Sequence, residues 1–330
     1  MSCTLDINIK TEKRDKFVFY ASNDFIIYKD NVRIIMADCG GQEMTSIRCP
    51  ADWRHFETLD IGDAVLLCLY GKDIIIFDKL GHEPVTYRID AHKIGRIITK
   101  LFRSDDNEMV FGTYSEDKVQ IVNYDFMGQT RIAQSSSWRA STIDDCIIED
   151  NTLYAIINAS TIVACDLKTC ENHWTRFEAG KIIPHLIPYD NGLLYACQRK
   201  LRYYKDKNIT NYSIPLIEPE GLIGKIDDVV FLTHNKNKYI VAYSMTEQKI
   251  LWEISGHARL LDSVIVRGKN KDQEVDLAVL MFDRHIGIVD LSHGQAAYHA
   301  RLGDLYQLRI TGNHILIHER NHNTHIMAGL

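Results

Sequence analysis

The chain has 330 residues, of which 45% are hydrophobic and 25% are charged, and its formal net charge is −6. This balance is typical of a soluble globular protein with a sizeable core, and it excludes extensive disorder. A negative net charge also disfavours a protein that holds nucleic acid through its overall charge, because such proteins are usually basic.

The first residues, MSCTLDINIKTEKRDK, mix acidic and basic side chains and contain no apolar run. That pattern is typical neither of a signal peptide nor of a membrane anchor. Apolar runs such as 64–70 are far shorter than the roughly 20 residues of a membrane-spanning helix. The eight cysteines include no C-x-x-C pair, which favours buried, reduced thiols over a disulfide framework. We therefore expect a cytoplasmic or nuclear protein with no membrane partner.

Apolar runs of strand length recur along the chain, roughly every 41 residues, and four-stranded propeller blades repeat at about 40–45 residues. A tight turn and a second strand follow each run, and a third, more polar strand usually comes next, as at 84–90 and 249–255. The sequence therefore predicts an all-β fold, a single closed β-propeller of about eight four-stranded blades, with seven as the alternative count. The runs begin at Phe25, Val65, Met109, Leu153, Leu193, Val229, Leu277 and Ile315.

The two ends of the chain predict how the ring closes. The last blade runs out at Leu330 with three strands, whereas the strand-like segment Thr4–Lys10 precedes a complete first blade. Because an open ring would leave an unpaired sheet edge, we expect residues 4–10 to supply the missing strand. No linker divides the chain, so residues 1–330 are interpreted as one domain. Residues 52–59 are compatible with either a turn of helix or an inner strand.

One turn carries a more specific pattern, in which Ala164, Asp166, Thr169, Cys170 and Trp174 share the spacing A-x-D-x-x-T-C-x-x-x-W. It resembles the A-x-D-x-x-T-G-x-x-x-W docking motif of the quinoprotein-like propellers, with cysteine in place of glycine. In that family the tryptophan lies on the outer strand and packs between neighbouring blades. The resemblance therefore implies a structural role for Trp174.

Two further segments keep parts of the same spacing, namely 242–252, which ends in Trp252, and 288–298, which ends in Tyr298. The segment Gly112–Asp125 is similar to the late part of a WD repeat, although no W-D dipeptide occurs in the chain. The chain thus resembles a divergent propeller between the quinoprotein-like and WD-repeat-like superfamilies. Fold alone does not transfer chemistry, so neither quinone-dependent oxidation nor any other cofactor is predicted.

The densest histidine cluster lies near the C-terminus, where His318, His322 and His325 accompany Glu319. Imidazoles and a carboxylate on one hairpin could converge on a divalent metal. The spacing is not that of a helical H-E-x-x-H site. An exposed polar loop of the last blade is the interpretation that we favour, with the metal site as its alternative.

A second cluster mixes basic and aromatic side chains on the predicted hairpin of the fifth blade, and a shorter basic loop occupies 267–271. Such a mix could contact phosphates and stack bases, or it could contact an acidic protein, which is at least as strongly indicated. Solvated hairpins without a partner are the interpretation that we favour, with the acidic protein and RNA as the alternatives if the clusters bind something. The residues predicted to bind partners are Arg199, Lys200, Arg202, Tyr203, Tyr204 and Lys205.

The carboxylate pairs at 144–145 and 227–228 could form acid–base or metal sites near a central channel, but such pairs are more often turn residues. The chain contains no nucleophile elbow, P-loop, kinase set or dinucleotide fingerprint. We therefore predict a non-catalytic scaffold, itself monomeric, that binds other proteins in a larger assembly. The alternatives are an RNA-associated accessory subunit of an RNA-modifying or RNA-processing complex, and a hydrolase or lyase with its site in the channel.

Overall fold

The structure is a computed structural model, and every element whose bounds it describes is a β-strand in an antiparallel sheet. This confirms the all-β prediction. Within the described part of the chain, no helix is long and apolar enough to cross a membrane. The described residues are 8–12, 16–50, 53, 56–69, 73–90, 94–105, 107–214, 216–256, 258–270 and 273–328.

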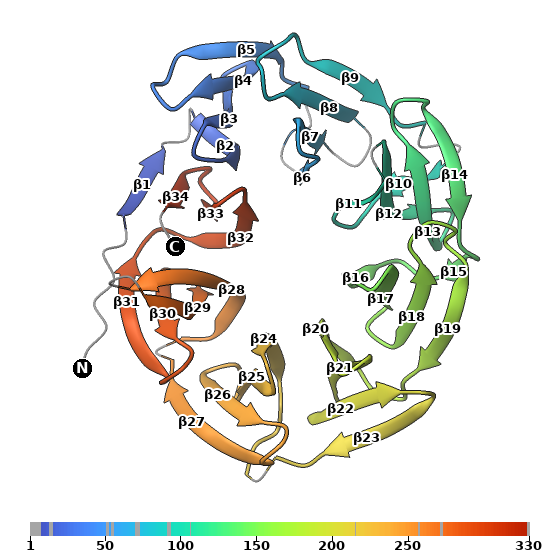
Figure 1. The fold of residues 1–330 in the computed structure, drawn as a ribbon, viewed down its shortest axis with the longest axis vertical. Coiled ribbons are helices and arrows are strands. Elements are labelled where there is room, and N and C mark those ends of the chain that lie inside the picture. Colours follow the sequence, from blue (N-terminus) through green and yellow to red (C-terminus); the bar gives the residue numbers. More distant parts are fainter. Residues whose placement is uncertain are drawn as a thin grey trace. The chain divides into compact units, whose positions relative to one another are not determined.

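Eight sheets carry these strands (Figure 1). The first contains β2 (Lys16–Ala21), β3 (Phe25–Asp30), β4 (Arg33–Asp38) and β5 (Glu43–Arg48). The second contains β6 (Phe56–Asp60), β7 (Ala64–Leu69), β8 (Asp73–Asp78) and β9 (Val85–Arg88). The third contains β10 (Arg96–Ile97), β11 (Phe102–Asp105), β12 (Glu108–Ser115), β13 (Lys118–Asp125), β14 (Thr130–Gln134) and β15 (Trp138–Arg139). The fourth contains β16 (Ile143–Glu149), β17 (Thr152–Ile157), β18 (Thr161–Asp166) and β19 (Asn172–Phe177).

The other four sheets repeat this order. The fifth contains β20 (Ile182–Tyr189), β21 (Gly192–Cys197), β22 (Lys200–Lys205) and β23 (Asn208–Tyr212). The sixth contains β24 (Gly221–Ile226), β25 (Val229–His234), β26 (Tyr239–Ser244) and β27 (Lys249–Ser255). The seventh contains β28 (Leu260–Asn270), β29 (Gln273–Phe282), β30 (His285–Asp290) and β31 (Gln295–Arg301). The eighth contains β32 (Leu305–Thr311), β33 (His314–Glu319), β34 (Thr324–Ala328) and β1 (Asn8–Glu12).

The sheets are the blades of an eight-bladed β-propeller, which confirms the higher of the two predicted counts. The third sheet has six strands because its inner and outer strands are each broken: β10 and β11 both pair with β12, and β14 and β15 both pair with β13. In the eighth sheet β1 pairs with β34, from Asn8 opposite Ala328 to Glu12 opposite Thr324. The N-terminal segment therefore supplies the fourth strand as predicted, although residues 4–7 of that prediction lie outside the described residues.

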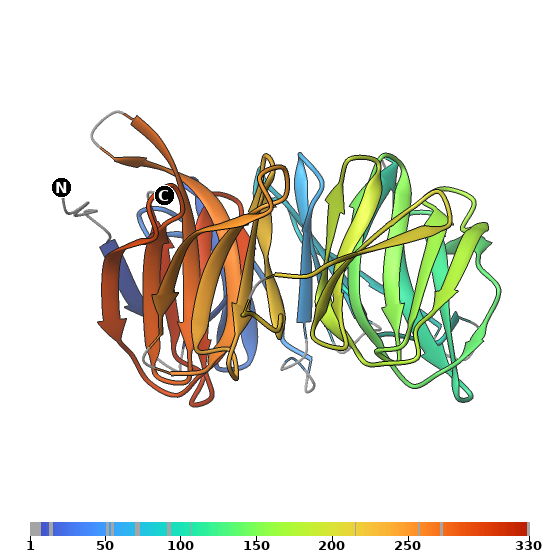
Figure 2. The same ribbon diagram turned by 90° about the horizontal axis from the view of Figure 1, so that it is seen from below.

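The chain forms two compact units, one of residues 1–31 with 189–330 and the other of residues 32–188. The single domain inferred from the sequence stays a prediction. In the unit that contains both chain ends, β28 and β29 are the longest strands, and their hairpin projects beyond its neighbours (Figure 2). Arg267 of the predicted basic loop lies on this hairpin and forms an ion pair with Asp276 at 3.5 Å.

The two middle strands are largely buried in most sheets, with β22 as an exception, whereas the outer strands carry mainly exposed and partly buried residues. Five of the six residues of β7 are buried and all six of β33 are, but exposure alternates along β27. Middle strands are covered on both faces by neighbouring sheets, which is why their sequences are continuous apolar runs. One core cluster joins Leu66 of the second sheet to Phe111 of the third, so the core lies between the blades.

Whereas β6 pairs with β7 in unbroken register, five inner strands share one irregularity, a register shift that marks a β-bulge. It occurs between Val18 and Tyr20, Ile143 and Asp145, Leu222 and Gly224, Leu260 and Asp262, and Leu305 and Gln307.

For residues 52–59 the sequence is compatible with either a turn of helix or an inner strand. In the structure residues 56–60 form the inner strand β6, whereas 52, 54 and 55 lie outside the described residues. The seven described cysteines are free thiols, and five of them are buried.

Candidate functional site

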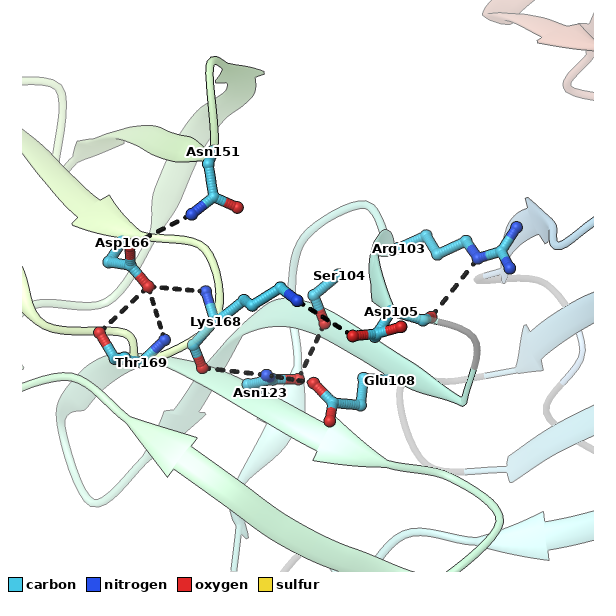
Figure 3. Close-up of polar contacts among 9 residues, drawn as sticks. All are labelled: Arg103, Ser104, Asp105, Glu108, Asn123, Asn151, Asp166, Lys168 and Thr169. Carbon is cyan, nitrogen blue, oxygen red and sulfur yellow. Dashed lines mark hydrogen bonds and ion pairs between the residues drawn. The ribbon is translucent and has the colours of Figure 1, made fainter.

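The turn after β18 is organised by one carboxylate. Asp166 Oδ1 accepts hydrogen bonds from the Lys168 and Thr169 amides at 2.9 and 2.7 Å and from the Thr169 hydroxyl at 3.1 Å (Figure 3). The Thr169 amide is the largest of the interactions that lower the pKa of the Asp166 carboxyl. Cys170 then adopts a positive φ of 56°, which explains why the related motif has glycine there.

The same turn recurs in five other sheets, although the sequence pattern identified it in only two of them. A side-chain oxygen at the end of the third strand accepts a backbone hydrogen bond from two to four residues further on, and a residue with positive φ follows at the third or fourth position. The pairs are Asp38 with Gly41, Asp78 with Gly81, Asp125 with Gln129, Ser244 with Gln248, and Asp290 with Gly294.

The turns matter because they receive side chains from the preceding blade. Trp252 of β27 donates from Nε1 to the Leu291 carbonyl oxygen at 3.1 Å and packs against Gly294 of the seventh sheet. Tyr298 of β31 is partly buried against a cluster that includes Ile315 of the eighth sheet. Both residues therefore lie between neighbouring blades, as the motif implies.

Trp174 and Met44 are two further outer-strand residues in the unit of residues 32–188. Trp174 is partly buried, and its ring centroid lies 6.0 Å from that of Tyr154. Its docking against the next blade stays a prediction. Met44 of β5 contacts Gly81 of the second sheet, where an added Cβ would lie 3.2 Å from the Met44 Cβ. Met44 is the bulged residue of β5, next to Thr45, which pairs with Met36 as Trp252 pairs with Ala242. Sequence reasoning missed this contact because neither residue is aromatic.

A polar network joins the third and fourth sheets (Figure 3). The fully buried Asn123 donates from Nδ2 to the Lys168 carbonyl oxygen at 3.0 Å and to Glu108 at 2.8 Å. Its Oδ1 accepts from the Ser104 hydroxyl at 3.1 Å, and Lys168 pairs with Asp105 at 3.0 Å. Each residue of the network is hydrogen-bonded within the protein. We therefore interpret the network as a structural contact that holds the third and fourth blades together.

The C-terminal histidines do not form an exposed loop, so that interpretation was wrong for His318 and His325, which are both buried. His325 Nε2 lies 2.8 Å from Glu319 Oε1. His318 stacks on Phe17 of β2, with ring centroids 4.7 Å apart, and burial lowers its pKa to about 3. His322 lies edge-on to the same phenylalanine at 6.2 Å. Within the described ranges no three His, Cys, Asp or Glu side chains are grouped so that they could hold a metal ion.

The residues predicted to bind partners occupy the whole of β22 and the turn before it. Arg199 is in the two-residue turn between β21 and β22, and its guanidinium pairs with Glu218 at 2.7 Å. Lys200 is exposed beside it. At the other end of the strand, Lys205 pairs with Asp190 at 3.1 Å. The basic side chains are therefore not concentrated at one hairpin tip, because the length of the strand separates them.

The side chains in the middle of β22 are partly or fully buried. Tyr204 is buried, and the Tyr203 hydroxyl donates to the Asp190 carbonyl oxygen at 2.8 Å. Arg202 Nη2 donates to Gln198 Oε1 at 3.1 Å. Of the six residues, only Arg199 and Lys200 are exposed. The two form the part of the predicted site that is most accessible to a partner.

The carboxylate pairs have structural positions. Asp145 Oδ2 accepts hydrogen bonds from the amides of His185 and Leu186 at 3.0 and 2.9 Å, and so holds β20 beside β16. Asp228, in the turn between β24 and β25, accepts from the Ser244 hydroxyl at 2.8 Å, an interaction that lowers the pKa of the Asp228 carboxyl. The pair at 227–228 therefore lies in a turn, as the alternative proposed, whereas the pair at 144–145 lies within the inner strand β16.

No protein-family model matches the chain, and neither does any curated protein. Solved structures do match it over nearly its whole length. BamB from Moraxella catarrhalis aligns with a TM-score of 0.68 and 14% identity, covering 98% of this chain and 99% of that one. The computationally designed Ika8 protein aligns with 0.67 and 13%, covering 97% and 98%, and the C-terminal WD40 domain of Sif2 with 0.64 and 11%, covering 96% and 98%. The chain therefore has the fold of the quinoprotein-like and WD-repeat propellers that its motifs resemble.

Proposed function

We propose that the protein is a non-catalytic scaffold that binds other proteins within a larger assembly. One observation supports this most directly: the side chains that the sequence offered for catalysis or metal binding are engaged in structural contacts. Asp145 binds backbone amides, Asp228 binds Ser244, and Glu319 binds His325. Each of these carboxylates accepts a hydrogen bond from a structural partner, which orients it within the fold.

The proposal places part of the binding surface at Arg199, in the turn between β21 and β22, and at Lys200, the first residue of β22. Arg199 is exposed, and its pairing with Glu218 is between two surface groups, which contributes little to stability. A partner carboxylate could therefore replace Glu218 at small cost. Because exposed charges are screened over about 8–10 Å at physiological ionic strength, such binding would weaken as salt rises.

Chemical crosslinking of the tagged protein, followed by mass spectrometry, tests the proposal. We expect stable protein partners whose crosslinks include the turn at 198–200, and we expect Arg199→Glu with Lys200→Glu to reduce their recovery. The matched control reverses Lys236 and Lys238, which are exposed in the equivalent turn between β25 and β26. Recovery of no protein, or equal recovery with both double variants, would contradict this part of the proposal.

A further inference from the structure

A repeated position in the unit of residues 32–188 carries exposed arginines that the motif analysis did not use. In each blade the first residue of the third strand is paired with the last residue of the outer strand. We call the four outer-strand residues at this position the outer-strand row. The pairs are Arg33 with Arg48, Asp73 with Arg88, Lys118 with Arg139, and Thr161 with Phe177, so the row is Arg48, Arg88, Arg139 and Phe177.

The row runs along successive blades of this unit. Met44 of β5 contacts Gly81 of the second sheet, and the Tyr87 hydroxyl of β9 lies 3.5 Å from Met127 Sδ of the third. Asn123 of the third sheet is hydrogen-bonded to Lys168 of the fourth. In Figure 1 the outer strands β5, β9, β14, β15 and β19 follow one another along the outer edge of the unit. Because the blades share one strand order, the row lies at the same end of each.

The row has an excess of positive charge. Arg48 and Arg139 are exposed, and no ion pair joins either of them to another residue that the structure describes. Each lies directly opposite a second cation, Arg33 or Lys118. Like charges directly opposite one another on a sheet destabilise it. Glu43 already lies 3.0 Å from Arg33 in the first pair, whereas a bound anion would relieve the repulsion between Lys118 and Arg139.

Only Arg88, between these two pairs, is neutralised by its opposite residue. Its guanidinium lies 2.9 Å from Asp73, although 73% of its side chain remains exposed. The three pairs thus contain five basic residues and one carboxylate. A ligand along the row would meet positive charge at Arg48 and at Arg139. Between them, the positive charge of Arg88 is reduced by Asp73.

Apolar side chains border the charges at both ends. Val32, in the turn before β4, is 68% exposed. Its carbonyl oxygen accepts a hydrogen bond from the Cys49 amide at 2.7 Å, which places Val32 next to Arg48. Phe177, at the other end of the row, is 71% exposed. Exposed large apolar residues beside exposed guanidinium groups are characteristic of protein interaction surfaces.

We propose that the outer-strand row binds an extended acidic segment of a partner protein, with carboxylates at Arg48, Arg88 and Arg139 and apolar side chains at Val32 and Phe177. The inference rests on the proposed scaffold role and adds a second contact surface to it. A nucleic acid fits less well, because its continuous phosphate chain would also face Glu43 and Asp73, which already pair with Arg33 and Arg88. A peptide can place its carboxylates only where the arginines are.

Fluorescence anisotropy with a synthetic probe tests the proposal on the full chain. The probe is a short fluorescein-labelled peptide of Glu alternating with Ser or Gly, with a Leu at each end. We expect binding that weakens with added salt, and a roughly tenfold or greater loss for the triple variant Arg48→Glu, Arg88→Glu, Arg139→Glu, since tenfold corresponds to about 1.4 kcal/mol. The matched control reverses Lys249, Arg267 and Arg284, three exposed basic residues of the other unit, and should bind the probe like the native protein.

A single variant separates binding from folding. Arg139→Glu replaces the like-charge pair with Lys118 by an opposite-charge pair, so we expect its Tm to rise slightly while its affinity for the probe falls. A loss of affinity caused by misfolding would lower the Tm instead. A Gln-for-Glu probe should not bind, and a Ser-for-Leu probe should bind more weakly.

Two results would overturn the inference. One is equal probe affinity for the triple variant and the native protein, which would leave the scaffold role and its crosslinked partners unaffected. The other is tighter binding of a uridine oligonucleotide than of the peptide through the same three arginines, which would assign the row to nucleic acid.

Discussion

The indole of Trp252 lies directly over Gly294 of the neighbouring blade. A Cβ added at 294 would be 2.5 Å from Trp252 Cδ2, and the backbone there has a positive φ of 65°. Two independent causes thus require glycine at this position: the conformation and the close approach of the ring. The interface between the sixth and seventh blades depends on both.

We expect Gly294→Ala to destabilise the protein by on the order of 2 kcal/mol, because the methyl group would both strain the turn and displace the indole. Thermal unfolding measures the effect. Gly287→Ala is the control, since its Cβ would come no closer than 3.5 Å, to Phe282, and its φ is not positive. Equal shifts in Tm for the two variants would argue against the docking interpretation.

The third and fourth blades carry the same contact with the sizes of the two residues reversed. Ala133 pairs with Asn123 just as Trp252 pairs with Ala242, so alanine occupies the docking position. On the fourth blade, Cys170 is fully buried in the hydrophobic cluster against which Ala133 packs. The cysteine fills space that an indole would otherwise occupy, which explains its departure from the glycine of the motif.

We therefore expect Ala133→Trp to destabilise the protein, and Cys170→Gly to restore much of that loss when the two changes are combined. Contacting residues commonly show coupling energies of about 0.5–3 kcal/mol. Urea unfolding of both single variants and the double variant measures the coupling. Strictly additive losses would show that the two positions do not share one space.

The blade repeat could be predicted because the middle strands are buried on both faces and therefore appear as continuous apolar runs, as β7 does. Three of the docking turns could not. Asp38 and Asp78 are followed by glycine one residue earlier than in the motif, and Asp125 is followed by Gln129 at the position of the motif's glycine. Nor could the burial of His318 be predicted, because the ring that covers it belongs to Phe17, about 300 residues away in the sequence. The outer-strand row likewise depends on strand register, which brings Arg33 opposite Arg48.

His318 should make the stability of the protein depend on pH. Burial lowers its pKa to about 3 in the folded protein, whereas an unfolded histidine titrates near 6.5. Between these values the unfolded chain binds a proton that the folded protein does not. The free energy of unfolding therefore decreases as the pH falls from about 6.5 towards 3, and this group has no such effect at higher pH.

Urea unfolding at pH 7.5 and at pH 5 measures this dependence. We expect His318→Gln to lose stability at pH 7.5 but to show a smaller decrease between the two pH values than the native protein. His173→Gln is the control because His173 is exposed, and it should leave the decrease unchanged. The assignment to His318 would be wrong if both variants kept the native pH dependence.

The strand β1 should be needed for the stability of the last blade, although terminal residues are ordinarily dispensable. It pairs with β34 over Asn8–Glu12, and without it β34 would become an unpaired edge. Such an edge is a template for pairing with another chain. We expect deletion of residues 1–12 to lower the Tm and to produce oligomers, measured by size-exclusion chromatography with light scattering. Deletion of residues 1–7 leaves β1 in place and should have neither effect. A shorter chain, starting at residue 13, that remained monomeric with an unchanged Tm would show that the edge of β34 is protected in another way.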